Sequence, residues 1–373
     1  MNLQSLVLWL HRWVGLVAGL LILVLAGTGA IMAFAEEMEY ATSPAPNRKG
    51  HPAHDPIPLE ELVARVVAQS PGKRILGIRL PSHADASVKV VTSDRRTFYL
   101  DPGTGDILTV QSVNSGVMQA ITELHLNLML RKTGSWVVRV GTLLTLLLAL
   151  TGLWIWWPRK VFGFRRGSNW RRFTFDLHKV AGLYSSGFLV IVTLTGTTMA
   201  FGKTADGMIR KWTGAPAPAA PPQSGRAPGA EPILLSQIVQ RAKSALLGAS
   251  VVSFGMPVSR RAPFRVQMKF PEDHTPGGRS LVFLDQFSGE VLQVESTRGV
   301  HPGNWYVAFQ HSLHTGEIFG LRSKILASLV CIALGLQVLS GFAMWWRPKP
   351  SRPRPGREGI SGAVDCGSVR LPN

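Results

Sequence analysis

Four long apolar stretches predict four membrane-spanning helices. They cover residues 6–34, 136–157, 175–201 and 325–346, with few charged side chains in each. At about 1.5 Å of rise per residue, 20 or more apolar residues cross about 30 Å of hydrocarbon. The first stretch is followed by acidic residues rather than by a small-residue cleavage site, and no basic segment precedes it. We therefore interpret it as a retained span and not as a signal peptide.

The segments between the first and second spans and between the third and fourth predict soluble structure. Apolar residues follow a helical period in two places and alternate as in strands in four. The helical period covers 59–69 and 235–247, and the alternation covers 88–92, 97–100, 264–270 and 280–284. Each half of the chain thus predicts a span, a small α+β domain and a second span.

The two halves also resemble each other residue by residue. Leu10-His11 recurs as Leu177-His178, and Leu124-His125 recurs as Leu313-His314. Two spans separate equivalent points, so the halves predict parallel repeats rather than inverted ones. We expect an α-helical membrane protein whose four-span bundle is built from two parallel repeats.

The net charge of +18 first suggests a nucleic-acid partner, but its distribution changes that interpretation. Basic residues gather in the short link 159–172 and in the tail 347–373. Short loops dense in Lys and Arg stay on the cytoplasmic side of a membrane. We therefore expect membrane lipid and no nucleic acid as a partner, both termini in the cytoplasm, and the α+β domains outside. A few basic residues lie near the outer span ends instead, namely Arg131, Lys132, Arg322 and Lys324.

These patterns divide the chain into eight segments. They are a first transmembrane helix in 1–35, a first outer domain in 57–110, an outer helix and second transmembrane helix in 117–158, the basic loop 159–172, a third transmembrane helix in 173–202, a second outer domain in 232–293, an outer helix and fourth transmembrane helix in 303–346, and the basic tail 347–373.

A histidine inside a membrane span is costly and marks a candidate functional site. His11 lies about 8 Å inside the first span, and His178 lies at the matching depth in the third. Small residues follow each histidine four and eight positions on, which predicts a groove for a flat macrocycle. The alternative is tight helix packing through small residues beside a hydrogen-bonded histidine. These small residues are Gly15, Gly19, Gly182 and Ser186.

A second pair, His125 and His314, lies just outside the second and fourth spans. Each could be an ordinary interfacial histidine. His311 precedes His314 by three residues and shares its helical face, so it could be the ligand instead or bind a propionate. The repeat register favours His314.

Two facing imidazoles suit a six-coordinate haem iron, which favours electron transfer because no coordination position stays open. Zn²⁺ or Cu²⁺ is the competing interpretation, but no carboxylate or thiolate stands beside either pair to complete a four-ligand site. Two tiers of histidines predict two haems. No C-x-x-C-H motif is present, so the haems are expected to be b-type and non-covalent. Candidate propionate partners, with interfacial anchoring as the alternative, are Arg12, Lys179, Arg131, Arg139, Arg322 and Lys324.

The other histidines and the cysteines predict no further site. The two cysteines, Cys331 in a span and Cys366 in the tail, allow neither an outer disulfide framework nor a four-cysteine iron–sulfur cluster. The remaining histidines are interpreted as surface residues, namely His51, His54, His83, His274 and His301.

With these motifs the chain resembles the PepSY-associated transmembrane family of iron-regulated inner-membrane proteins, and its siderophore-reductase members in particular. The resemblance rests on the LHRWVGL and LHKVAGL openings, on LHLNLML and LHTGEIFG, on the TG-x-W-x-W-W and SG-x-A-x-W-W endings, and on the turns YLDPGTGDIL and FLDQFSGEVL. It implies two periplasmic PepSY-like domains, a bacterial inner-membrane location, two b-type haems on His11, His178, His125 and His314, and a ferric siderophore as substrate. The second domain departs from the pattern by an insertion around 272–279.

We therefore expect a haem-dependent ferric-siderophore reductase that carries electrons from the His11–His178 tier to the His125–His314 tier. Two alternatives remain open. A secondary transporter can be built from parallel repeats, although no span has a proline break or a central acidic residue. A non-enzymatic PepSY sensor or inhibitor module would not need paired histidines at two depths. No G-x-G-x-x-G motif precedes a helix, so a cytoplasmic protein or a quinol must supply the electrons.

Overall fold

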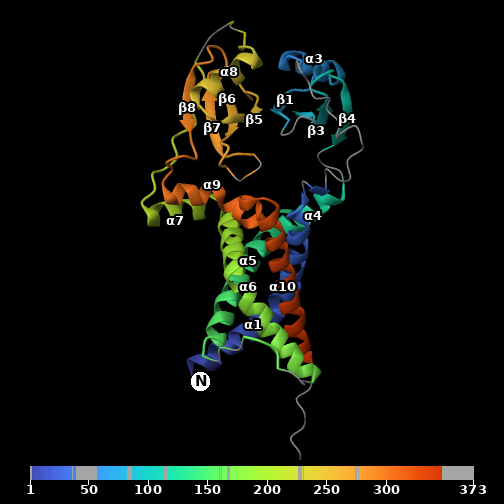
Figure 1. Ribbon diagram of the computed structural model, residues 1–373, viewed down its shortest axis with the longest axis vertical. Coiled ribbons are helices and arrows are strands. Elements are labelled where there is room, and N and C mark those ends of the chain that lie inside the picture. Colours follow the sequence, from blue (N-terminus) through green and yellow to red (C-terminus); the bar gives the residue numbers. More distant parts are fainter. Residues whose placement is uncertain are drawn as a thin grey trace, which may run out of the picture.

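The computed structural model of the chain describes residues 2–35, 37–38, 57–81, 86–112, 116–158, 160, 162–165, 169–225, 229, 231–273, 275 and 277–346. It consists of a long helical bundle with a β-sheet assembly beyond one end (Figure 1). The N-terminus of the first helix lies at the opposite end of the bundle (Figure 1).

Four helices are long and apolar enough to cross a membrane, as the sequence predicted. They are α1 (Leu3–Met32), α5 (Arg131–Trp156), α6 (Trp170–Phe201) and α10 (Leu321–Trp346). Each packs against two neighbours in the cyclic order α1, α5, α6, α10, so α1 and α6 are diagonal partners. Large apolar side chains such as Val17 and Leu20 remain exposed on the outside of the bundle. Helices that are apolar on all sides are typical of membrane spans, and the chain is a multi-pass membrane protein.

Asparagine caps set the starts of two spans. Asn2 accepts a hydrogen bond from the backbone N–H of Ser5 at 2.9 Å, and Asn169 accepts one from Arg172 at 3.0 Å. Asparagine is among the best residues at this position because its side chain satisfies an N–H that has no partner within the helix. The α6 cap makes this helix start ahead of the apolar stretch, so that Asp176 and His178 lie inside it.

Two groups of one helix and four strands form the part beyond the bundle. The first comprises α3 (Leu59–Gln69), β1 (Ile75–Arg79), β2 (Val88–Thr92), β3 (Arg96–Leu100) and β4 (Ile107–Ser112). The second comprises α8 (Leu235–Ala245), β5 (Ser250–Gly255), β6 (Phe264–Lys269), β7 (Ser280–Leu284) and β8 (Val291–Glu295). Strands β1, β4, β5 and β8 fall outside the segments that the alternation predicted.

The two groups share one antiparallel sheet, in the order β4-β3-β2-β1-β5-β6-β7-β8. The sequence predicted two small domains, whereas the structure joins them edge to edge by pairing β1 with β5. At this seam Ile78 stands opposite Phe254, and both side chains are 2% exposed. The physical reason is that each strand would otherwise be an unpaired sheet edge.

Helices α3 and α8 cover one face of the sheet and close a single apolar core. Leu62 and Val66 of α3 pack with Ile238 of α8 and with Val266 of the sheet. The helices also touch directly, because Ser236 donates from both its backbone N–H and its hydroxyl to Glu60, at 2.9 and 2.8 Å. Within the described part of the chain, no helix of this core covers the opposite face of the sheet.

Shorter helices lie between the sheet and the bundle. They are α4 (Val117–Asn127), α7 (Lys203–Thr213), α9 (Pro302–Thr315) and the 3₁₀ turn η2 (Glu317–Phe319). Helix α7 was not predicted; it packs beside α9, where Arg210 donates to the side-chain oxygen of Asn304 at 2.9 Å. Helices α4 and α9 pack on the bundle. They place His125 and His314, respectively, at the end of the bundle that faces the sheet.

Candidate functional site

The inner histidine pair lies in the interior of the bundle, between the four spans. His11 of α1 and His178 of α6 face each other with ring centroids 6.3 Å apart and ring planes at 86°. Because α1 and α6 are diagonal partners, the pair occupies the position where all four spans meet. The sequence repeat had placed these residues at equal depth, and the structure brings them together.

The outer pair lies between the two shorter helices that cap the bundle. His125 of α4 and His314 of α9 have ring centroids 6.3 Å apart and ring planes at 58°. His314 therefore stands opposite His125, as the repeat register favoured. His311 lies on the exposed side of α9 and lines a cavity beneath the sheet.

In the inner pair, hydrogen bonds fix the proton on Nδ1 of each ring. The Nδ1 atom of His178 lies 3.0 Å from the carbonyl oxygen of Gln337, which can only accept, so this nitrogen donates. Nδ1 of His11 lies 2.9 Å from the hydroxyl of Thr151, whose own proton goes to the carbonyl of Leu147. That hydroxyl therefore accepts from His11. Both Nε2 atoms keep a free lone pair, the state needed for binding a metal.

The outer pair has the same arrangement. Nδ1 of His314 donates to the carbonyl oxygen of Val192 at 2.9 Å. Nδ1 of His125 donates to the hydroxyl of Thr28 at 2.8 Å, because the Thr28 proton goes to the carbonyl of Val24. Metal-ligating histidines almost always donate their second ring nitrogen in this way. All four histidines are thus held in one tautomer.

A Ser/Thr-Gly dipeptide from a neighbouring helix contacts each histidine. The hydroxyl approaches Nδ1, and the glycine leaves room for the ring. A Cβ added at the glycine would lie 2.9 to 3.7 Å from the ring Cε1. The four dipeptides are Thr151-Gly152 for His11, Ser340-Gly341 for His178, Thr28-Gly29 for His125 and Thr195-Gly196 for His314. The sequence analysis did not identify these dipeptides as histidine contacts.

The spacing of the rings fits one iron held by two axial imidazoles. A bond from an imidazole nitrogen to a first-row metal is about 2.0–2.1 Å long, so two such bonds place the ring centroids a little over 6 Å apart. Both pairs have a spacing of 6.3 Å. Within the part of the chain that the structure describes, no three His, Cys, Asp or Glu side chains gather as a site for a bare metal ion.

Burial keeps the outer pair neutral. Burial and, secondarily, the neighbouring His314 lower the pKa of His125 to about 4. Burial also lowers the pKa of His314. Neutral imidazole is the form that binds a metal, so both residues are in the competent protonation state at neutral pH.

Several other candidate residues have structural partners of their own. The pocket of small residues expected next to His11 is partly filled, because Gly19 packs against the ring of Phe342; here the helix-packing interpretation holds. Lys324, a candidate propionate partner, is buried and forms an ion pair with Glu37 at 2.9 Å. His301 caps α9 by accepting the N–H of Gly303. Four further histidines lie outside the described residues, namely His51, His54, His83 and His274.

Four apolar spans with histidines paired across the bundle define a multi-pass membrane protein with two candidate cofactor sites. The family model of the PepSY-associated TM region matches residues 8–347, and the chain belongs to that family. The resemblance seen in the sequence motifs is thereby confirmed. No curated protein matches the chain.

Proposed function

We propose that the protein is a di-haem transmembrane electron-transfer protein, a reductase of ferric siderophore iron at the periplasmic face of the bacterial inner membrane. The observation that supports this best is the presence of two equally spaced histidine pairs at two depths. Thr28, whose hydroxyl accepts from His125, lies 17 positions after His11 on α1. This separation corresponds to about 25 Å along the helix. The two tiers thus lie near opposite ends of the bundle.

Haem b bound between the members of each pair would supply one-electron transfer without an open coordination site. The chain's own residues hold and orient the cofactor. The four histidines offer Nε2, and the hydroxyls and carbonyls at Nδ1 prevent rotation of the rings. The apolar spans exclude water from the inner tier.

The orientation in the membrane follows from the basic residues. Lys160 and Arg165 belong to the link between α5 and α6, and Arg171 and Arg172 to the first turn of α6. This link lies at the end of the bundle away from the sheet (Figure 1). We propose that this end is cytoplasmic, by the preference of short basic loops for that side. The two halves are proposed to be parallel repeats, and the sheet assembly to be a pair of periplasmic PepSY-like domains.

The proposed reaction transfers one electron to the Fe³⁺ of a chelate and leaves Fe²⁺. The donor is a cytoplasmic protein or a membrane quinol. Hard oxygen ligands hold Fe²⁺ less tightly than Fe³⁺, so reduction releases the metal. His314 lies on the helix whose His311, three residues earlier, lines the space beneath the sheet.

The test begins with protein purified from haem-replete cells. We expect two b-type haems per chain by pyridine haemochrome analysis, and complete removal of the colour by acidified organic solvent. Reduced protein mixed with a ferric chelate should return to the oxidised spectrum while a ferrous indicator develops colour. A colourless preparation that is fully folded contradicts the proposal and favours a transporter or a sensor module.

A further inference from the structure

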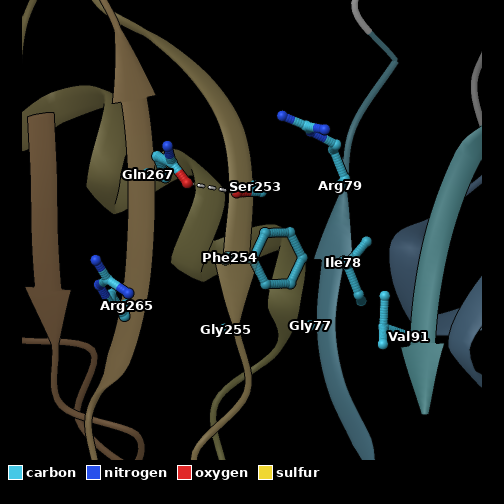
Figure 2. A pocket seen from close by; sticks show the side chains of 9 residues that line it. All are labelled: Gly77, Ile78, Arg79, Val91, Ser253, Phe254, Gly255, Arg265 and Gln267. Carbon is cyan, nitrogen blue, oxygen red and sulfur yellow. Dashed lines mark hydrogen bonds between the residues drawn. The ribbon is translucent and has the colours of Figure 1, made fainter. Parts of the chain in front are cut away.

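A polar cavity of about 330 Å³ opens on the uncovered face of the sheet, at the seam between β1 and β5. Gly77 and Gly255 stand opposite each other across the seam, so no side chain fills the space there. Ile78 and Phe254, the neighbours of these glycines, point to the opposite face and belong to the core. Figure 2 shows the residues that line the cavity.

Cross-strand register places two arginines around this space. Arg79 of β1 is paired with Ser253 of β5, which is paired with Gln267 of β6. One row away, Gly255 is paired with Arg265. Ser253 donates its hydroxyl proton to Gln267 at 3.1 Å, which fixes the amide between the two arginines (Figure 2). The cavity therefore exists only because strands from both halves of the chain pair.

A second cavity of about 200 Å³ continues from the first toward the bundle. The two share Arg79 and Gln267, and the second reaches Arg279, His311 and Glu317. His311 lies one helical turn before His314 on α9. The combined space thus leads from the seam of the sheet to α9, the helix that carries His314.

The combined space is positively charged. Three arginines line it against one carboxylate, that of Glu317. Among the described residues, no carboxylate forms an ion pair with Arg79, Arg265 or Arg279. Arg279 donates one hydrogen bond to the hydroxyl of Ser312 on α9 at 3.2 Å, so its guanidinium is held at the cavity.

An unsatisfied polar group in the wall also points to a ligand. Thr275 lines the second cavity and is 2% exposed, and its buried hydroxyl has no hydrogen-bond partner among the described residues. Buried polar atoms are nearly always satisfied, so this hydroxyl is available to a bound molecule. Gln267 donates its amide to the carbonyl of Gly278 at 3.1 Å, which fixes the loop beside Thr275.

We propose that the two cavities form one binding site for an anionic, carboxylate-rich ferric chelate. The inference rests on the proposed function and names the charge class of its substrate. Arginine binds carboxylates with two parallel hydrogen bonds, and three arginines match a chelate with several free carboxylates. The same arginines repel a chelate that carries a net positive charge. Occupancy of this site places the metal beside α9, next to the outer tier.

The test uses haem-loaded, full-length protein in detergent and gallium(III) citrate as the probe. Ga³⁺ has the charge and nearly the radius of Fe³⁺ but is not reduced, so binding is measured without electron transfer. We expect saturable binding by isothermal titration calorimetry. It should be at least tenfold tighter than the binding of metal-free citrate, of inorganic phosphate, or of a gallium trihydroxamate that carries a free ammonium group. Binding should weaken as salt is added, because ions screen exposed charges.

Two variants and one control locate the site. Arg79→Gln and Arg265→Gln should each weaken gallium citrate binding at least fivefold with an unchanged haem spectrum. Arg65→Gln removes a charge from α3, which covers the opposite face of the sheet, and should change the affinity less than twofold. Equal affinities in all three variants, or equal binding of phosphate, overturns the inference. Folded protein that contains no haem after purification from haem-replete cells, and that still binds gallium citrate, overturns the proposed function instead.

Discussion

Gly196 of α6 packs directly against the imidazole of His314, where a Cβ added to the glycine would lie 2.9 Å from the ring Cε1. At the corresponding contact in the inner tier, a Cβ on Gly341 would lie 3.7 Å from Cε1 of His178. The first distance is shorter than an ordinary carbon–carbon contact, and the second is not. The two glycines therefore differ in what an alanine would do.

Gly196→Ala is expected to move His314 out of line with His125 and at least halve the content of the outer haem. Overpacking of this kind commonly destabilises by about 1–3 kcal/mol, so a lower melting temperature should accompany the loss. Gly341→Ala is the matched control and should keep both haems. Haem content per chain and redox titration measure the outcome; unchanged haem in Gly196→Ala would contradict the contact.

Ligand pairing is tested by single alanine substitutions. His11→Ala and His178→Ala should each remove the same haem. His125→Ala and His314→Ala should each remove the other haem. The reason is that the two rings within each pair have centroids 6.3 Å apart. Optical and electron paramagnetic resonance spectra distinguish the two haems. Each of the four variants should also abolish ferric chelate reduction.

His311→Ala is the control for that series. It should retain both haems, since His311 lines the cavity and does not face His125. Loss of different haems in His11→Ala and His178→Ala would show pairing within each half and refute the two-tier arrangement.

Removal of a hydrogen bond behind a ligand should weaken haem binding without removing the ligand. Thr28→Val deletes the acceptor of the His125 Nδ1–H, and losses of such partners cost about 10–100-fold in metal affinity. The outer haem should dissociate faster in transfer to apomyoglobin, and its midpoint potential should shift. Thr145→Val is the control, because among the described residues the Thr145 hydroxyl bonds only to the backbone of its own helix, at the carbonyl of Gly141. Equal rates in both variants would argue against a role for the hydroxyl.

Membrane orientation is tested with reporter fusions. Reporters after Asn373 or near Ser168 should report cytoplasm, and reporters near Gly50 or Gln223 should report periplasm, because short basic segments remain inside. Cysteine accessibility at the same positions gives an independent measurement. A periplasmic result at Ser168 would reverse the proposed direction of electron flow.

The spans and the histidine pairs were predictable because their signals are local. Apolar length predicts a span, and an ungapped repeat carries His11 onto His178. The glycine contacts were not predictable, since Thr-Gly occurs in many helices. Gly29 contacts the ring of His125 because α1 packs against α4, and Gly196 contacts the ring of His314 because α6 packs against α9.

The seam between β1 and β5 had no local signal. Gly77 and Gly255 weaken the strand pattern of both segments, and the strands that pair lie far apart in the chain. The cavity depends on that pairing, so no pattern in the sequence singles out Arg79 as a binding residue. Helix α7 lies between the predicted third span and the predicted second outer domain, in a stretch to which the sequence analysis assigned no element.

The seam also has a consequence for symmetry. Strands that pair in opposite directions are exchanged by a half-turn about an axis through the sheet. The proposed repeat likewise relates His11 to His178 and His125 to His314, the members of the two ring pairs. A flat cofactor between two related histidines would meet nearly equivalent surroundings on its two sides. At the seam the equivalence ends, because the half-turn that exchanges Ile78 with Phe254 carries Arg79 onto Gly255, which has no side chain. We therefore expect the symmetric histidine pairs to carry the electrons, and the asymmetric residues at the seam to determine which substrate binds.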